Sequence, residues 1–297
     1  MKKKIFIAGG VSIDSIIYLP EFPQPRPQTI HECRFNETLG STGSGKALNL
    51  CRLGFEVTLH ALIGDDIWGR QAIEELQHPN LRFIYDIDPN GTERHTNIMN
   101  EAGQRISVFT NNVDENPDLD YNKFIPMIQD ADIVVVNLAG YTKKLLPLVK
   151  ACGKEIWTDL HDYDDVNPWH NEFIEWSDYV LMSSDNLPDY EPFMHKMMER
   201  EKKLVVVTHG SKGSSGSDKT SGLINIPAMK VEKPTDTNGA GDAYFSGFLY
   251  SHAAGFSLKE CMQAGSIAGG MCVQSARLFN SELSATELEK QRTLFYY

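Results

Sequence analysis

The stretch that decides the fold is Thr235-Asp-Thr-Asn-Gly-Ala-Gly-Asp-Ala-Tyr-Phe-Ser-Gly247. Its small residues lead directly into a pattern with helical spacing that starts near Asp242. Glycines at this point let backbone N–H groups converge at a helix N-terminus, an arrangement that holds anions such as phosphate. A carboxylate beside an anion hole would repel phosphate unless it served a purpose, such as taking a proton from an attacking hydroxyl. Asp is also favoured at helix starts for structural reasons alone, so spacing leaves both interpretations of Asp242 open.

Strand-like and helix-like segments alternate on the N-terminal side of this stretch. Short apolar runs indicate buried strands, and their alternation with helical spacing predicts a parallel sheet with helices on both faces. The expected strands are residues 4–8, 57–63, 133–137, 155–159, 179–182 and 204–208. The expected helices are 45–53, 69–76, 122–128, 142–151 and 192–200, followed by two long helices rich in small residues, 241–254 and 257–276.

Two segments do not fit this alternation. Residues 12–39 are first rich in proline and then extended, and residues 92–111 alternate around a turn at Glu101-Ala-Gly-Gln104 that predicts a β-hairpin. We expect the two segments, at about 12–39 and 92–112, to form a small β lid outside the main sheet. A single domain spanning 1–297 is the expected organisation, and two independent domains are the alternative.

Composition excludes several functional classes. The 297 residues contain 28 Lys+Arg against 40 Asp+Glu, and the formal net charge of −12 argues against nucleic acid or an anionic membrane as the main partner. No apolar stretch approaches the ~20 residues that a membrane helix needs. Asp14 interrupts the apolar N-terminal run, which therefore indicates a first buried strand rather than a signal peptide. The five scattered cysteines contain no C-x-x-C pair, so we expect reduced thiols and a cytoplasmic location.

Motifs along the chain resemble, in order, those of the ribokinase-like (PfkB) carbohydrate and nucleoside kinases. Asp236-Thr-Asn-Gly-Ala-Gly-Asp242 resembles that family's D-T-x-G-A-G-D signature, and Gly9-Gly-Val-Ser-Ile-Asp14 resembles its opening. Thr208-His-Gly-Ser-Lys-Gly213 resembles its T-x-G-x-x-G nucleotide loop, and the glycines between residues 40 and 69 resemble its N-terminal segment. The resemblance covers about residues 5–277. It implies an α/β fold, a three-layer α/β/α sandwich with a mostly parallel central sheet and a small β lid.

The resemblance also implies a function and a set of site residues. The expected activity is ATP-dependent phosphorylation of a hydroxyl on a small sugar, with a nucleoside kinase or a non-catalytic sugar- or nucleoside-binding relative as alternatives. Asp242 would be the base, and the anion hole for the γ-phosphoryl group would be Gly239, Ala240 and Gly241. The expected substrate-binding residues are Asp14, Gly40, Gly43 and Gly45, and the expected nucleotide-binding residues are Thr208, Gly210, Gly213 and Ser183. The implied cofactors are ATP and Mg²⁺, with K⁺ in many members, and Asp236 and Asn238 match the monovalent-cation position. A homodimer is the implied assembly.

Some positions depart from the family pattern. Gly45 stands where sugar-kinase members usually carry an Asn that contacts substrate, and Ser41 replaces the second glycine of a Gly-Gly pair. Ser183 and Asn186 stand in place of an N-x-x-E motif that supports Mg²⁺ through water, with Asp185 as a candidate substitute. Asp159 matches only the first residue of D-x-N-x-R. Since the Arg that would pair a carboxylate is missing, we expect a neutral sugar or nucleoside rather than an acidic sugar.

Three further patterns admit rival interpretations. Gly40-Ser-Thr-Gly-Ser-Gly-Lys-Ala47 nearly matches the P-loop of ATPases, although Ala47 lacks the hydroxyl that the motif places on Mg²⁺. Asp159-Leu-His-Asp-Tyr-Asp-Asp165 is either a metal site or a solvated loop. Arg94 or Arg105 either reaches over the phosphates when the lid closes or is a solvated hairpin charge.

Overall fold

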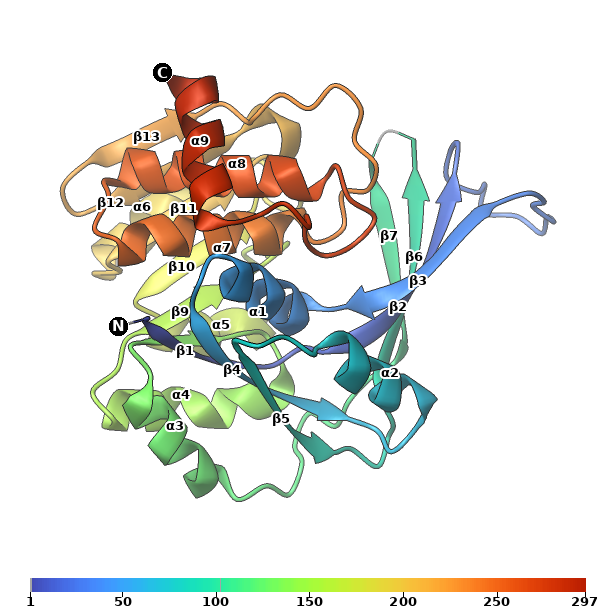
Figure 1. The fold of residues 1–297 in the computed structure, drawn as a ribbon, viewed down its shortest axis with the longest axis horizontal. Coiled ribbons are helices and arrows are strands. Elements are labelled where there is room, and N and C mark those ends of the chain that lie inside the picture. Colours follow the sequence, from blue (N-terminus) through green and yellow to red (C-terminus); the bar gives the residue numbers. More distant parts are fainter. Residues whose placement is uncertain (1, 102) are drawn as a thin grey trace.

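A computed structural model describes residues 2–101 and 103–297 as a layered α/β sandwich from which a smaller sheet projects (Figure 1). The central sheet contains β1 (Lys4–Ala8), β4 (Glu56–Ile63), β5 (Leu81–Ile87), β8 (Ile133–Val136), β9 (Ile156–Asp159), β10 (Tyr179–Ser183), β11 (Leu204–Thr208), β12 (Ser214–Asp218) and β13 (Gly222–Ile226). Their order is β13-β12-β11-β10-β9-β8-β1-β4-β5. The strands from β11 to β5 are parallel, whereas β12 and β13 are antiparallel additions at one edge.

The apolar runs form central strands because each run fills two cores. Successive side chains of a strand point to opposite faces, so an uninterrupted apolar run suits a sheet that is covered on both sides. In β1, Ile5 and Ile7 pack into one core, and Phe6 and Ala8 pack into the other.

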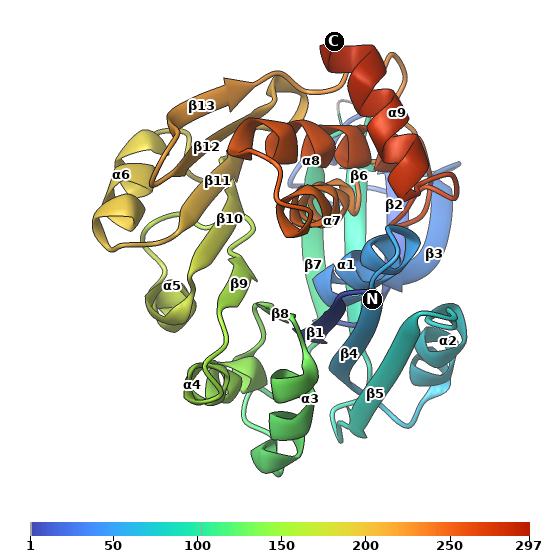
Figure 2. The same cartoon turned by 60° about the vertical axis from the view of Figure 1, so that its left-hand side comes forward.

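Helices cover both faces of the sheet (Figure 2). One core lies beneath α1 (Thr42–Arg52), α2 (Ile67–Glu75), α7 (Ala240–Ala253), α8 (Leu258–Cys272) and α9 (Ala285–Tyr296). The other lies beneath α3 (Ile125–Asp130), α4 (Leu145–Ala151), α5 (Asn171–Trp176) and α6 (Glu191–Glu199). The two small-residue-rich helices pack closely, since a Cβ atom at Gly247 of α7 would lie 2.6 Å from the Ala264 carbonyl oxygen of α8.

The lid sheet has the strand order β3-β2-β6-β7. It comprises β2 (Ser12–Leu19), β3 (Arg34–Gly40), β6 (Glu93–Asn100) and β7 (Arg105–Asn111). These strands come from the two segments that did not fit the alternation, and β6 and β7 pair as the predicted hairpin. One residue of the predicted turn, Ala102, lies outside the described residues. The sheet stands beside the N-terminal ends of α1 and α7 (Figure 1).

Some elements differ from the sequence-based expectation. The second long helix ends at Cys272 rather than at residue 276, and the Val273 carbonyl accepts a hydrogen bond from the Thr235 amide (2.7 Å). The sequence patterns do not predict β5, α5, the β12–β13 hairpin or α9. The sequence of β12, Ser-Ser-Gly-Ser-Asp, contains poor strand formers, and the strand forms because it pairs with β11.

Within the described ranges, every helix is too short or too polar to cross a membrane.

Candidate active site

The site lies where the parallel strands end. From β1, the chain adds β4 and β5 on one side and β8 to β11 on the other, so the winding of the sheet reverses at β1. Ligands of open α/β sheets bind outside the carboxyl ends of the strands at such a reversal. Asp159, Ser183 and Thr208 end β9, β10 and β11, and β2 of the lid begins just after β1.

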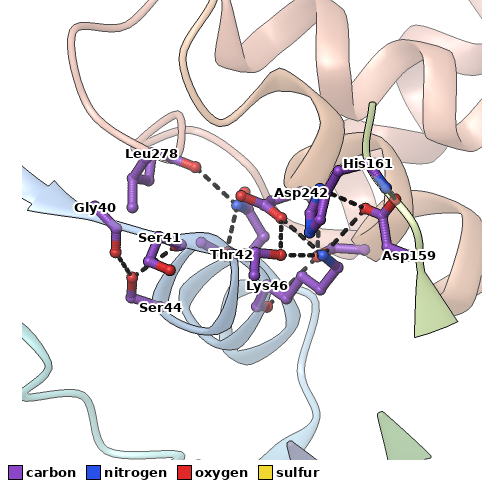
Figure 3. Close-up of polar contacts among 12 residues, drawn as sticks. Gly40, Ser41, Thr42, Ser44, Lys46, Asp159, His161, Asp242 and Leu278 are labelled. Carbon is purple, nitrogen blue, oxygen red and sulfur yellow. Dashed lines mark hydrogen bonds and ion pairs between the residues drawn. The ribbon is translucent and has the colours of Figure 1, made fainter. Parts of the chain in front are cut away.

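Asp242 lies in the first turn of α7 but does not cap the helix. The N-cap is Gly239, in a left-handed conformation (φ 77°), and no side chain caps the helix. The carboxylate turns toward α1, where its Oδ1 accepts hydrogen bonds from Thr42 Oγ1 (2.7 Å) and Lys46 Nζ (2.8 Å) (Figure 3). Its side chain is 12% exposed. The helix-start interpretation of Asp242 therefore does not account for where the carboxylate points.

Lys46 is fully buried between two acidic side chains. Its Nζ lies 3.1 Å from Asp159 Oδ2 and also donates a hydrogen bond to Thr42 Oγ1 (Figure 3). Burial alone would lower the pKa of Lys46, but the carboxylates of Asp242 and Asp159 outweigh it and raise that pKa above its usual value. Burial likewise opposes the charge of Asp159, yet His161 and Lys46 hold the pKa of that carboxyl at about 2. Lys46 and Asp159 are therefore both charged at neutral pH.

These contacts contradict the P-loop interpretation. β3 ends at Gly40 and α1 begins at Thr42, so the residues between Gly40 and Ala47 are mostly helical rather than a loop around a phosphate. Lys46 lies within the helix, and its ammonium group is committed to side chains of this chain.

Asp14 of β2 is buried within the lid sheet. Its Oδ1 accepts a hydrogen bond from Ser12 Oγ (2.6 Å) and lies 3.0 Å from His95 Nδ1, and its Oδ2 accepts a hydrogen bond from Asn97 Nδ2 (2.9 Å). The other ring nitrogen of His95 lies 3.1 Å from Glu93 Oε1. Burial opposes the charge of the imidazole, but Asp14 and Glu93 raise the pKa of His95 to about 9.

The glycines predicted to bind substrate make room for other groups of the chain. A Cβ atom at Gly40 would lie 2.1 Å from Asp14 Oδ1, and one at Gly43 would lie 1.8 Å from the Gly9 carbonyl oxygen. A Cβ atom at Gly45 would lie 2.6 Å from Asp242 Oδ2. Gly43 therefore serves the packing of α1 against the Gly9-Gly10 turn that follows β1. Gly40 and Gly45 give space to the two carboxylates of the site.

Ser41 is strained at the junction between β3 and α1. Its backbone angles (φ 65°, ψ 158°) fall in a region that is essentially restricted to glycine. The departure from a Gly-Gly pair at this position therefore has a conformational cost. Such strain persists only where the surroundings fix the conformation, here between the lid and the buried Lys46.

The nucleotide loop joins β11 to β12. Gly213 has φ 114°, and a Cβ atom there would lie 2.0 Å from the Ile226 carbonyl oxygen, so the position requires glycine. A Cβ atom at Gly210 would meet nothing within 4 Å, so this backbone is open to a ligand. Ser183 stands on the neighbouring strand, where Thr208 Oγ1 donates to the Met182 carbonyl (3.3 Å).

The lid contacts the loop that precedes α7. Tyr18 donates a hydrogen bond to Asp236 Oδ2, and Asp236 Oδ1 accepts one from the Asn238 amide (2.8 Å). Arg105 Nη1 of β7 donates to Asn238 Oδ1 (3.0 Å). The Arg105 side chain therefore reaches the loop that carries the anion-hole motif, whereas Arg94 stacks on Trp68 (3.9 Å to the ring centroid).

The acidic segment from Asp159 to Asp165 does not form a metal site. Within residues 2–101 and 103–297, no group of three or more His, Cys, Asp or Glu side chains is arranged to hold a metal ion. Sequence reasoning also missed Lys46, Thr42 and His95 as members of the site. The sequence drew attention to Lys46 only through the near match to a P-loop, which assigns the lysine to phosphate rather than to Asp242.

The uncapped start of α7 and the part-buried Asp242 in its first turn lie at the end of the parallel strands, where open α/β sandwiches bind their ligands. The sequence profile of the pfkB family carbohydrate kinases matches residues 170–284. The acarbose 7(IV)-phosphotransferase of Actinoplanes sp. is 30% identical over 272 residues, which cover 89% of this chain and 90% of that protein.

Solved structures agree with this comparison. The microbiome-derived acarbose kinase Mak1 superposes with a TM-score of 0.85 at 25% identity, over 99% of this chain and 100% of that one. The ribokinase of Arabidopsis thaliana, solved with ribose and ATP, superposes with a TM-score of 0.78 at 18% identity, over 98% and 99% of the two chains. The chain belongs to the ribokinase-like pfkB family of carbohydrate kinases. It is an ATP-dependent sugar kinase, and its substrate is a small molecule.

Proposed function

We propose that this kinase transfers the γ-phosphoryl group of ATP to a hydroxyl of an uncharged sugar, with Asp242 as the general base. The observation that carries the proposal is the placement of the Asp242 carboxylate beside the amides that begin α7. Its Oδ1 is held by Thr42 and Lys46. Its Oδ2 forms no hydrogen bond with any residue of the described ranges, and is therefore free to accept a proton.

The chemistry uses these residues in fixed positions. Asp242 Oδ2 takes the proton of the acceptor hydroxyl as its oxygen bonds to the γ-phosphorus. The bond from that phosphorus to the bridging oxygen breaks, and ADP leaves with the electron pair. The amides of Gly239 and Gly241 stabilise the charge on the transferring group, since donors at a helix N-terminus are oriented in advance. The amide of Ala240, also predicted for the anion hole, donates instead to the Thr237 carbonyl (3.3 Å). A positioned base contributes roughly 10²–10⁴-fold to such a reaction.

Asp14 would bind the sugar on the lid side. An ionised carboxylate accepts about four hydrogen bonds. Ser12, His95 and Asn97 occupy three of these positions on Asp14, which leaves one on Oδ2 for a sugar hydroxyl. The pocket is rich in carboxylates, and the segment after β9 has no Arg. An uncharged acceptor therefore fits better than a sugar acid.

ATP would lie along Thr208, Gly210 and Gly213, with Ser183 on the adjoining strand. Mg²⁺ usually binds through substrate phosphates, waters and one or two carboxylates, so this ion needs no cluster of protein ligands. The exposed Asp185, two residues beyond the end of β10, is the carboxylate that fits this role. When bound, Mg²⁺ would neutralise charge on the phosphates.

The residues predicted for a monovalent cation fit that ion poorly. Both oxygens of Asp236 accept hydrogen bonds, from Tyr18 and from the Asn238 amide. The guanidinium group of Arg105 lies on Asn238 and would repel a cation. We do not extend the proposal to K⁺.

A panel of acceptors tests this function. Because two similar proteins are named for acarbose, the panel contains acarbose together with D-ribose, D-fructose, adenosine and 2-keto-3-deoxygluconate. The measurement is acceptor-dependent release of ADP from Mg-ATP. We expect one uncharged acceptor to raise ADP release well above the rate with water alone. A preference for 2-keto-3-deoxygluconate would contradict the proposed substrate class. ATP hydrolysis at the same rate with and without each acceptor would contradict the proposed kinase activity.

The surface of the lid supports a proposal about assembly. Phe35 of β3 and Ile106 and Val108 of β7 are between 44% and 59% exposed. Exposed apolar side chains on a small sheet favour burial against another molecule. We propose that two copies of the chain form a homodimer through the lid. We also propose that the protein is cytoplasmic and binds neither nucleic acid nor membrane. Analytical ultracentrifugation measures the oligomeric state.

A further inference from the structure

We propose that Lys46 is a positioning residue of this kinase, which holds Asp242 so that one carboxylate oxygen, Oδ2, meets the acceptor hydroxyl. The inference rests on the proposed role of Asp242 as the base. It gives a function to a residue that lies outside the motifs shared with the family.

The hydrogen bonds of Lys46 exclude a direct role on phosphate. An ammonium group has three N–H donors. Three oxygens surround Nζ: Thr42 Oγ1, Asp242 Oδ1 at 2.8 Å and Asp159 Oδ2 at 3.1 Å (Figure 3). The side chain has no exposed surface, and the ring of Phe245 closes another side with its centroid 4.9 Å from Nζ. Lys46 therefore has no donor left for a ligand and acts through its neighbours.

The two carboxylate oxygens of Asp242 have different surroundings. Lys46 and Thr42 both bind Oδ1, from positions one helical turn apart on α1. Oδ2 points over the backbone of Gly45, into the space that a side chain would otherwise fill. Gly45 and Lys46 thus form one feature, because the lysine draws the carboxylate toward α1 and the glycine leaves space for it.

Asp159 balances the charge of this arrangement. If Asp242 were the only carboxylate beside Lys46, the two side chains would form a neutral ion pair. The ammonium group would then make Asp242 less basic. With Asp159 as second partner, the ammonium group and the two carboxylates together carry one negative charge, apart from any charge on His161, whose Nδ1 lies 3.6 Å from Asp159 Oδ2. The backbone amide of His161 fixes Asp159 through its other oxygen (3.0 Å).

A charge-matched pair of variants tests the inference. Lys46→Met alone leaves Asp242 without a cation and leaves Asp159 with only His161 beside it, so its effects mix folding with positioning. Lys46→Met/Asp159→Asn keeps the total charge of the cluster at −1 but removes the lysine. We would measure thermal unfolding, kcat, and KM for ATP and for the acceptor, with acarbose, D-ribose and adenosine as the acceptors used.

The expected result is a separation of stability from turnover. The double variant should recover most of the melting temperature that Lys46→Met loses. Its kcat should remain at least about tenfold below that of the wild type, because a displaced reacting group costs up to roughly 10²-fold. Its KM for ATP should stay within about threefold of the wild-type value, since Lys46 does not touch the nucleotide. A double variant with wild-type kcat would overturn the inference.

Thr42 supplies a second test if variants of Lys46 do not fold. Thr42→Val removes the hydroxyl that binds Oδ1 and keeps the shape, and Thr42→Ser keeps the hydroxyl. A kcat for Thr42→Val at least about tenfold below that of Thr42→Ser supports positioning through Oδ1, and equal values contradict it.

Asp242→Asn distinguishes a failure of the proposed base from a failure of the proposed role of Lys46. Wild-type turnover in that variant would refute the proposed base itself, whereas an inactive Asp242→Asn with an active double variant would refute only the role of Lys46.

Discussion

Two buried clusters, one in the lid sheet and one in the sandwich, have the same composition: a cation between two carboxylates. In the lid, His95 lies between Asp14 and Glu93, at 3.0 and 3.1 Å. In the sandwich, Lys46 lies between Asp242 and Asp159, at 2.8 and 3.1 Å. Each cluster contains one carboxylate that we assign to the acceptor.

The clusters differ in the cation and in the elements that carry them. The imidazole of His95 belongs to a sheet of four strands, and its pKa is raised to about 9, so it loses its charge within an accessible pH range. The ammonium group of Lys46 lies inside a helix of the core, and its pKa is raised above the usual 10.5. The comparison indicates that the cation beside Asp14 loses its charge as the pH rises through about 9, whereas the cation beside Asp242 keeps its charge.

The largest expected effect is on the sandwich cluster. Lys46→Met leaves Asp242 without a cation and leaves Asp159 with only His161 beside it (3.6 Å), and breaking a buried pair in this way costs about 3–5 kcal/mol. Because the raised pKa of Lys46 keeps it charged, the loss in the free energy of unfolding should be nearly equal at pH 6 and pH 9. Urea unfolding at the two pH values measures it, and a loss that disappears by pH 9 would contradict the account.

The lid cluster should respond to pH. The pKa of His95 is raised from 6.5 to about 9, so its contribution to stability is fully present below pH 6.5 and is lost as the pH rises through about 9. His95→Gln keeps a donor and removes the charge. We expect it to cost about 1–3 kcal/mol at pH 6 and much less above pH 9. Thermal unfolding of both proteins across this range checks the prediction, and a difference independent of pH would show that His95 is neutral.

The smallest expected effect is a gain in stability at Ser41. Its backbone conformation suits glycine, so Ser41→Gly should raise the free energy of unfolding by about 1 kcal/mol. Ser41→Ala is the matched control, because it removes the hydroxyl and keeps the strain. If the alanine variant gains as much as the glycine variant, the strain is not the cause.

The sequence predicted the sandwich because its signals are local. Apolar runs such as residues 4–8 and 204–208 became central strands, and the motif ending in Asp242 became the start of α7. The elements that were missed depend on partners distant in the chain. β12 is polar and exists through pairing with β11, and α9 packs beside α8 through a few apolar residues such as Leu288.

The same limit applies to the site. Asp14, Asp242 and the glycines of the nucleotide loop were expected from motifs. The partners that hold the two carboxylates were not, because Lys46 and Asp242 are 196 residues apart and Asn97 and Asp14 are 83 apart. The local sequence around Lys46 or Asn97 does not indicate which carboxylate that residue contacts in the folded chain. The contacts of Asp236 with Tyr18 likewise depend on how the lid folds back onto the loop.

Replacement of the Asp242 carboxylate by an amide tests whether this residue is the general base. Asp242→Asn keeps the size of the side chain and removes its ability to take the proton. With Mg-ATP and the best acceptor of the panel, the account predicts that kcat falls at least roughly a hundredfold while the dissociation constant for ATP stays near the wild-type value. An asparagine variant that turns over at the wild-type rate would contradict the account.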